Sequence, residues 1–267
     1  MMTNMTLRGI LMGENFTGKV DDIMNSVKKK LLPLWGIGLA LFGLRLAEKL
    51  TGFDPVTGLA VPTPARYALI AAVVLAGAYA VAAGWKYHQD KPAFEEHFAA
   101  PGKWKGALVL GGFLFIGGGL WLGGQAGANH LGLAPMATAG LAALTGCGIL
   151  VLTKRMGDEE ADSTVAPLLP ALFFAAFWML SLYIPTGTDP VLARYWLPIL
   201  AAGMCAYALA QLAGFFRGES RVRDFAIVAR LAVMLSIGAA AEPDVTYAPL
   251  FIGCAVVLSA FLALEKE

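Results

Sequence analysis

Eight long apolar segments, separated by short polar stretches, dominate this sequence. Crossing the hydrocarbon core of a bilayer takes about 20 apolar residues in helical form, because backbone groups that face lipid need hydrogen-bond partners within their own segment. The chain is 58% hydrophobic and 15% charged, with a mean hydropathy of +0.66, and is therefore more apolar than soluble domains usually are. The sequence predicts an all-α fold, a polytopic membrane helix bundle with eight transmembrane helices, at residues 31–47, 67–85, 106–124, 133–152, 165–184, 195–215, 225–241 and 247–264.

Short motifs recur in the same order in the two halves of the chain. Asp-Pro-Val and Ala-Arg-Tyr each occur once per half, at 54–56 and 65–67 and again at 189–191 and 193–195. Spacing between the shared motifs is constant within a span and changes only in loops, as in a duplicated membrane unit, although Ala-rich and Leu-rich spans also match by chance. We therefore predict two parallel four-helix repeats, 31–155 and 165–267, joined by a cytoplasmic linker, 156–164.

Basic residues are distributed unevenly between the predicted loops. If the amino terminus is cytoplasmic, fifteen Lys and Arg lie on that side, four lie on the other, and Arg230 lies inside a span. By the positive-inside rule, we interpret the chain as a multi-pass protein of a bacterial-type cytoplasmic (inner) membrane with both termini in the cytoplasm. Residues 1–30 form a cytoplasmic N-terminal segment, either an interfacial helix or a disordered tail. The net charge of +1 does not indicate a nucleic-acid partner.

Two aspartates and two arginines on the predicted outer side are the first candidates for a ligand-binding site. Asp54 and Asp189 follow the first span of each half, and Arg66 and Arg194 begin the next span. A guanidinium group binds carboxylate or phosphate through two parallel hydrogen bonds, so the four residues could form one anion-binding mouth. The alternative is structural: the aspartates cap helix starts, and the arginines anchor the helices at the lipid headgroups.

Polar residues within the predicted spans are few. Arg230 lies about two turns into the seventh span, where its side chain can extend to the cytoplasmic headgroups, and Gln211 lies near the cytoplasmic end of the sixth. Both complete the set of candidate ligand-binding residues. No span has an acidic residue near its middle, so the sequence gives little support to an ion-coupled carboxylate relay.

Metal, cofactor and catalytic sites have weak support in the sequence. Cys147, Cys205 and Cys254 lie in predicted spans without a Cys-x-x-Cys motif, so we interpret them as packing residues. His88 and His97 share one cytoplasmic loop with several acidic residues, the only place where a membrane-embedded metal enzyme could be argued. We predict no cofactor, no metal and no catalytic residue.

Glycines at four-residue spacing mark a close helix contact. Gly119, Gly123 and Gly127 leave one face of the third span with little but backbone exposed. We expect the helix that approaches this face to belong to the same bundle rather than to a second protomer.

Three functional classes remain open. The first is a transporter of a small molecule or lipid-related solute, because parallel repeats can enclose a pathway at their interface. The alternative is a noncatalytic membrane subunit, or an assembly or scaffold protein, because large soluble domains and buried charges are not evident. A membrane-embedded enzyme is third. The expected partners are membrane lipids together with a small-molecule ligand or another membrane protein, and no nucleic acid.

Overall fold

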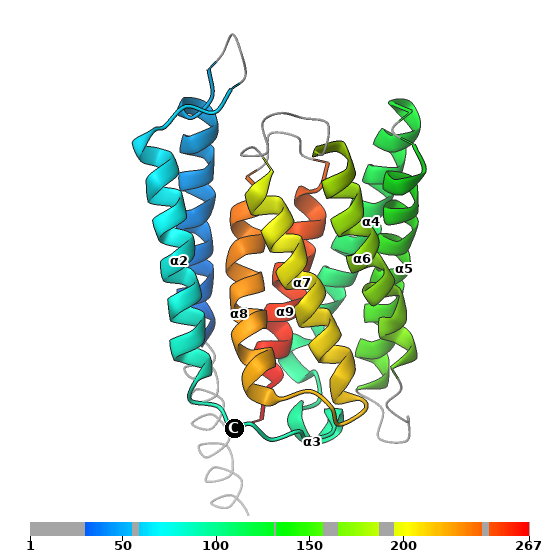
Figure 1. The fold of residues 1–267 in the computed structure, drawn as a ribbon. Coiled ribbons are helices and arrows are strands. Elements are labelled where there is room, and N and C mark those ends of the chain that lie inside the picture. The colour runs from blue at the N-terminus through cyan, green and yellow to red at the C-terminus, as the bar shows by residue number, and fades with distance from the viewer. Residues whose placement is uncertain are drawn as a thin grey trace, which may run out of the picture.

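Regular structure in this protein is helical wherever it is described. The computed structural model describes residues 30–54, 59–130, 132–156, 165–186, 195–241 and 246–266. Figure 1 shows a bundle of roughly parallel and antiparallel long helices: Lys30–Thr51, α2 (Pro64–Gly84), α4 (Lys105–Ala128), α5 (Leu133–Arg155), α6 (Leu169–Thr186), α7 (Trp196–Phe215), α8 (Val222–Ala239) and α9 (Ala248–Leu264). Shorter elements are α3 (Phe94–His97), η1 (Gly102–Trp104) and η2 (Ala166–Leu168).

Six helices are long and apolar enough to cross a membrane. They are the helix Lys30–Thr51 and the helices α2, α4, α5, α6 and α7. Together they identify the chain as a multi-pass helical membrane protein. Each of the eight predicted segments coincides with one long helix, but α9 has only 17 residues, and the 18 residues of α8 include Arg223, Asp224 and Arg230.

α8 and α9, the two long helices that are too short or too charged to count as candidate membrane spans, lie in the middle of the bundle. In Figure 1, α8 and α9 stand between the hairpin of Lys30–Thr51 with α2 on one side and α4, α5 and α6 on the other. From Phe225 to Ala239, α8 is almost entirely buried, and so is most of α9. Because protein rather than lipid surrounds α8, it can carry charged side chains that a lipid-facing helix would have to keep in water.

Glycines allow several helix pairs to approach to backbone contact. A Cβ atom on Gly119 would lie 2.6 Å from the carbonyl oxygen of Ala139 in α5, and one on Gly146 would overlap the carbonyl oxygen of Gly112 in α4. Gly123 and Gly127 also face α5. The contact predicted from the glycine spacing in α4 is therefore made within the same chain, as expected.

The contact between α4 and α9, which belong to different predicted halves, is apolar. α4 packs closely against α9, where a Cβ on Gly118 would lie 2.8 Å from the side chain of Leu250. Beside them, Phe115 of α4 makes an edge contact with Phe174 of α6 at a centroid distance of 5.4 Å. Phe174 stacks on Trp178, which contacts Phe251 of α9. These four aromatic side chains are fully buried and fill the space between α4, α6 and α9.

The helix pairings differ between the two predicted repeats. α7 packs against α8, the next long helix of its own half. In the first half the helix equivalent to α7 is α2, and it too packs against α8, which belongs to the other half. The duplication therefore stays a prediction.

The two ends of the bundle differ in their connections. α3 and the described C-terminal residues lie together at one end, here called the α3 end, and residues 52–54 and 59–63 lie at the opposite end (Figure 1). Described basic residues gather at the α3 end: Lys30, Lys86, Lys91, Lys103, Lys105, Lys154, Arg155, Arg217, Arg221, Arg223 and Lys266.

Candidate functional site

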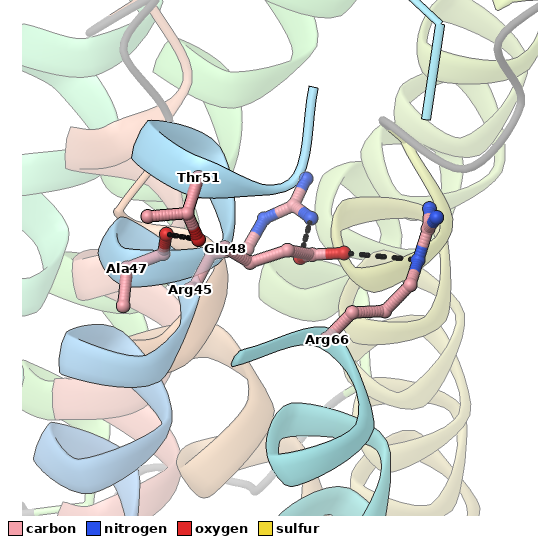
Figure 2. Close-up of polar contacts among 5 residues, drawn as sticks. All are labelled: Arg45, Ala47, Glu48, Thr51 and Arg66. Carbon is pink, nitrogen blue, oxygen red and sulfur yellow. Dashed lines mark hydrogen bonds and ion pairs between the residues drawn. The ribbon is translucent and has the colours of Figure 1, made fainter. Parts of the chain in front are cut away.

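One buried ionic cluster lies opposite the α3 end and contains Arg66, a candidate from the sequence. Figure 2 shows the carboxylate of Glu48 between two guanidinium groups. Arg45 Nη1 donates to Glu48 Oε2 at 2.5 Å, and Arg66 Nε lies 3.5 Å from Glu48 Oε1. The side chains of Arg45 and Glu48 are fully buried, and that of Arg66 is 17% exposed. We call these three residues the Glu48 cluster.

Local chain geometry places the members of the Glu48 cluster within reach of one another. In the helix Lys30–Thr51 the inward-facing positions include Leu41, Arg45 and Glu48, spaced by three or four residues. Directly after this helix the chain reverses, and α2 begins at Pro64, a residue suited to the first helical position. Thr63 occupies the N-cap position, but its hydroxyl group makes no capping hydrogen bond. The reversal puts Arg66, in the first turn of α2, beside Glu48.

The Glu48 cluster contains one carboxylate and two guanidinium groups. Glu48 hydrogen-bonds to Arg45 and lies 3.5 Å from Arg66, so an anion that approached Arg66 would meet a buried carboxylate beside it. Arg66 thus lies beside an internal carboxylate, and its role in an anion-binding mouth or as a headgroup anchor stays a prediction. Asp54 lies just beyond this helix, where its amide donates to the carbonyl of Leu59 at 2.9 Å. Asp189 and Arg194 lie outside the described residues.

A second buried polar cluster lies at the α3 end and contains Arg230. Arg230 Nη2 donates to the Tyr87 hydroxyl at 2.7 Å and lies 3.9 Å from Glu265 Oε2. The other oxygen, Glu265 Oε1, lies 4.0 Å from His97 Nε2. The Arg230 side chain extends toward the α3 end, which is the end predicted to be cytoplasmic. Because Arg230 is only 5% exposed, its side chain contacts protein groups there instead of solvent. We call Tyr87, His97, Arg230 and Glu265 the Glu265 cluster.

Backbone hydrogen bonds hold the Glu265 cluster together. The amide of Ala99 donates to the carbonyl of Leu264, and the amide of Lys266 donates to the carbonyl of His97, both at 2.8 Å. Between these bonds Phe98 and Glu265 pair as an isolated antiparallel bridge. The imidazole ring of His97 stacks on Phe215 at a centroid distance of 5.0 Å. These hydrogen bonds hold Glu265 and Lys266 against α3 and the residues that follow it.

Burial shifts the protonation equilibria of the Glu265 cluster. Loss of solvent raises the pKa of Glu265 to about 7, although Arg230, Lys30 and the nearby Tyr87 hydroxyl act in the opposite direction. Burial, assisted by the charge of Lys266, lowers the pKa of His97 to about 4. Tyr87 is near enough to influence the Glu265 carboxyl, but no hydrogen bond of ordinary geometry links the two. Near neutral pH the imidazole is therefore uncharged, and the carboxyl group is close to half protonated.

The candidates from the sequence that lie in the described residues belong to different sites. Arg66 belongs to the Glu48 cluster, whereas Arg230 lies in the Glu265 cluster at the other end of the bundle. Gln211, also near the α3 end, accepts a hydrogen bond from the Ser220 hydroxyl through its backbone carbonyl at 2.5 Å, which ties α7 to the turn before α8. Glu48 and Glu265, the acidic residues on which the two clusters depend, were not among the candidates predicted from the sequence.

Metal-binding groups are not assembled in the described part of the chain. There, no three His, Cys, Asp or Glu side chains lie close enough together to hold a metal ion. His88 is exposed, whereas His97 is buried in the Glu265 cluster. Cys205 instead contacts the hydroxyl group of Ser236 at 3.0 Å, between α7 and α8, in a packing role. Comparison of the chain with protein families, curated proteins and solved structures finds no match.

Proposed function

We propose that this membrane protein is a noncatalytic subunit or scaffold that assembles with another transmembrane protein. The observation that carries the proposal is the outward face of the helix Lys30–Thr51, which displays leucine and glycine at regular spacing. Leu32, Leu39 and Leu46 recur every seven residues on this exposed face. Gly36 and Gly43 lie between them, also seven residues apart, and have open space where a side chain would extend.

Such a face suits a neighbouring helix better than lipid. A seven-residue repeat keeps one seam of a helix facing a supercoiled partner, with large side chains filling holes on the opposite helix. Small residues on the seam allow two backbones to approach closely within a bilayer. The hairpin that this helix forms with α2 reaches the rest of the bundle through α8 and stands at the edge in Figure 1, which leaves its outer side accessible.

Transport through the interface of the two halves has less support. The described interface between α4 and α9 consists of apolar side chains and glycine contacts, and the aromatic residues beside it are fully buried. An open cleft of about 260 Å³ near His130 lies between α4 and α5, within one half. A membrane-embedded enzyme has less support again, because the described His, Cys, Asp and Glu residues assemble no metal-binding group.

Site-specific photocrosslinking in native membranes tests the assembly proposal. A photoreactive residue at Ala40, on the exposed face, should give one discrete adduct with another membrane protein, whereas the same residue at the exposed Leu120 of α4 should give only lipid adducts. Gly43→Leu should reduce the Ala40 adduct about tenfold by filling the seam. Gly117→Leu, at an exposed glycine of α4 with similar open space, is the matched control and should leave the adduct unchanged. Adducts to lipid alone, or to a second copy of this chain, would contradict the proposal.

We further propose that all eight long helices cross the bilayer as two parallel repeats, and that the α3 end is cytoplasmic in a bacterial-type inner membrane. The basic residues gathered at the α3 end support this orientation, because cytoplasmic loops are enriched in Lys and Arg. A reporter active only in the cytoplasm should be active when fused after Lys266 and inactive when inserted between Leu59 and Thr63. Activity at both positions, or at the second alone, would overturn the proposed orientation.

A further inference from the structure

Two unpartnered buried groups face each other within the Glu265 cluster. Both carboxyl oxygens of Glu265 and the Nε2 atom of His97 lack a hydrogen-bond partner, although the Glu265 side chain is only 1% exposed. Glu265 Oε1 and His97 Nε2 lie 4.0 Å apart. Buried polar groups without partners are uncommon because each one costs desolvation free energy, so this pairing of a potential donor with a potential acceptor requires an explanation.

Cations surround the carboxyl group of Glu265. Arg230 of α8 is the nearest, and Lys30 of the helix Lys30–Thr51 also acts on it. The Tyr87 hydroxyl approaches from the chain after α2, and Lys266 acts on His97 from the C-terminal side. A further positive charge, on His97, is disfavoured in such surroundings. A neutral imidazole, by contrast, offers Nε2 as an acceptor when its proton is on Nδ1.

We propose that His97 and Glu265 form a proton-binding pair, which holds one shared proton between Glu265 Oε1 and His97 Nε2. In this state the protonated carboxyl group donates to the neutral imidazole once the two atoms approach from their present separation to hydrogen-bond distance. The bond satisfies both groups without adding a charge. It also closes the contact between α3 and the C-terminal residues, because His97 and Glu265 belong to the segments joined there by the backbone hydrogen bonds of Ala99 and Lys266.

The C-terminal residues dock on α3 where His97 and Glu265 meet. The two members of the pair have opposite effects on how the stability of this docked state depends on pH. Glu265 has a docked-state pKa raised from 4.5 to about 7, so its contribution is present below pH 4.5 and is lost as the pH rises through about 7. His97 has a docked-state pKa lowered from 6.5 to about 4, so its contribution is present above pH 6.5 and is lost as the pH falls through about 4. Between about pH 4 and about pH 7 the docked pair holds one proton, mainly on Glu265. The undocked pair also holds one proton over most of this pH range, but on His97. The two effects therefore nearly cancel.

Amide hydrogen exchange of the full-length protein in lipid nanodiscs tests the pair. The reporters are the amides of Ala99 and Lys266, with protection compared at about pH 5.5 and about pH 8.5 after correction for the intrinsic exchange rate. By linkage, protection in the wild type should differ less than about fourfold between these conditions. Glu265→Gln leaves His97 alone and should lower protection roughly tenfold at the acidic pH relative to the alkaline pH. His97→Gln leaves Glu265 alone and should lower protection roughly thirtyfold at the alkaline pH.

Matched controls distinguish titration of the two buried groups from a merely structural contact. His88→Gln and Glu95→Gln change exposed residues of the same connection and should behave as the wild type does. Opposite pH slopes in Glu265→Gln and His97→Gln support the pair, even if both variants lose some protection at every pH. Equal, pH-independent losses in the two variants, or slopes of the same sign, would overturn it.

Discussion

Glu48→Leu is expected to lower the free energy of unfolding by about 3–5 kcal/mol, because it leaves a buried guanidinium group without its counter-charge. Arg45 is the group most affected, since it is fully buried and donates directly to Glu48. Arg66 is less affected because its side chain is partly exposed and can turn toward water. The measurement is equilibrium unfolding in mixed micelles, with increasing denaturing detergent, followed by helical circular dichroism.

A double replacement separates loss of pairing from loss of packing. Arg45→Met combined with Glu48→Leu removes both buried charges while keeping similar side-chain volume, and apolar replacement of a buried pair is often neutral or stabilising. The double variant should therefore recover most of the stability that Glu48→Leu loses, with a coupling energy of about 2 kcal/mol or more. If the double variant is as unstable as the sum of the two single variants, Glu48 acts by packing and the ionic interpretation is wrong.

Gly146→Ala is expected to destabilise the bundle by about 3 kcal/mol or to prevent folding. The new methyl group would overlap the carbonyl oxygen of Gly112 and lie 2.6 Å from the side chain of Ile116. A backbone oxygen cannot move aside as the end of a flexible side chain can, so α4 and α5 would have to separate along their closest contact. The expected effect is a large loss of stability in the same micelle assay, together with a lower yield of monodisperse protein.

Gly140→Ala provides the matched control on the same helix. Gly140 is exposed, and a Cβ there would have open space around it, so the replacement tests the intrinsic helix preference alone. Alanine is favoured over glycine in a helix interior by about 1 kcal/mol, so this variant should be unchanged or slightly more stable. Similar losses in Gly140→Ala and Gly146→Ala would show that the α4–α5 contact is not the cause.

Sequence reasoning located the helices better than it predicted their arrangement. Apolar run length alone identified all eight long helices, because a lipid-facing segment must form its backbone hydrogen bonds internally. The arrangement was not predictable in the same way, since most of these helices are apolar on every side and no stripe indicates a partner. α8 illustrates the difficulty: its Arg223, Asp224 and Arg230 weaken the membrane-span signal, yet it is among the most buried helices.

The site residues show which contacts can be found in a sequence. Arg230 was identified because a charged residue inside a span is rare, but Glu265 lies 35 positions later and comes beside it only through folding. Arg45 and Glu48 could have been found, because a spacing of three residues places two side chains on one helix face. Arg66 was identified from the sequence, but Glu48, the acid 3.5 Å from it, was not. The predicted equivalents in the second half, Asp189 and Arg194, lie outside the described residues, so the anion-binding mouth stays a prediction.

The central position of α8 and α9 has a consequence for biogenesis. These helices occupy the last 46 residues of the chain and leave the ribosome after every helix that surrounds them. The earlier helices α4 to α7 can pack against one another in chain order, but the hairpin of the helix Lys30–Thr51 with α2 gains its main contact only when α8 arrives. This contact therefore forms only after the long helices that precede α8 have been made, and a nascent chain stalled before Val222 lacks both central helices.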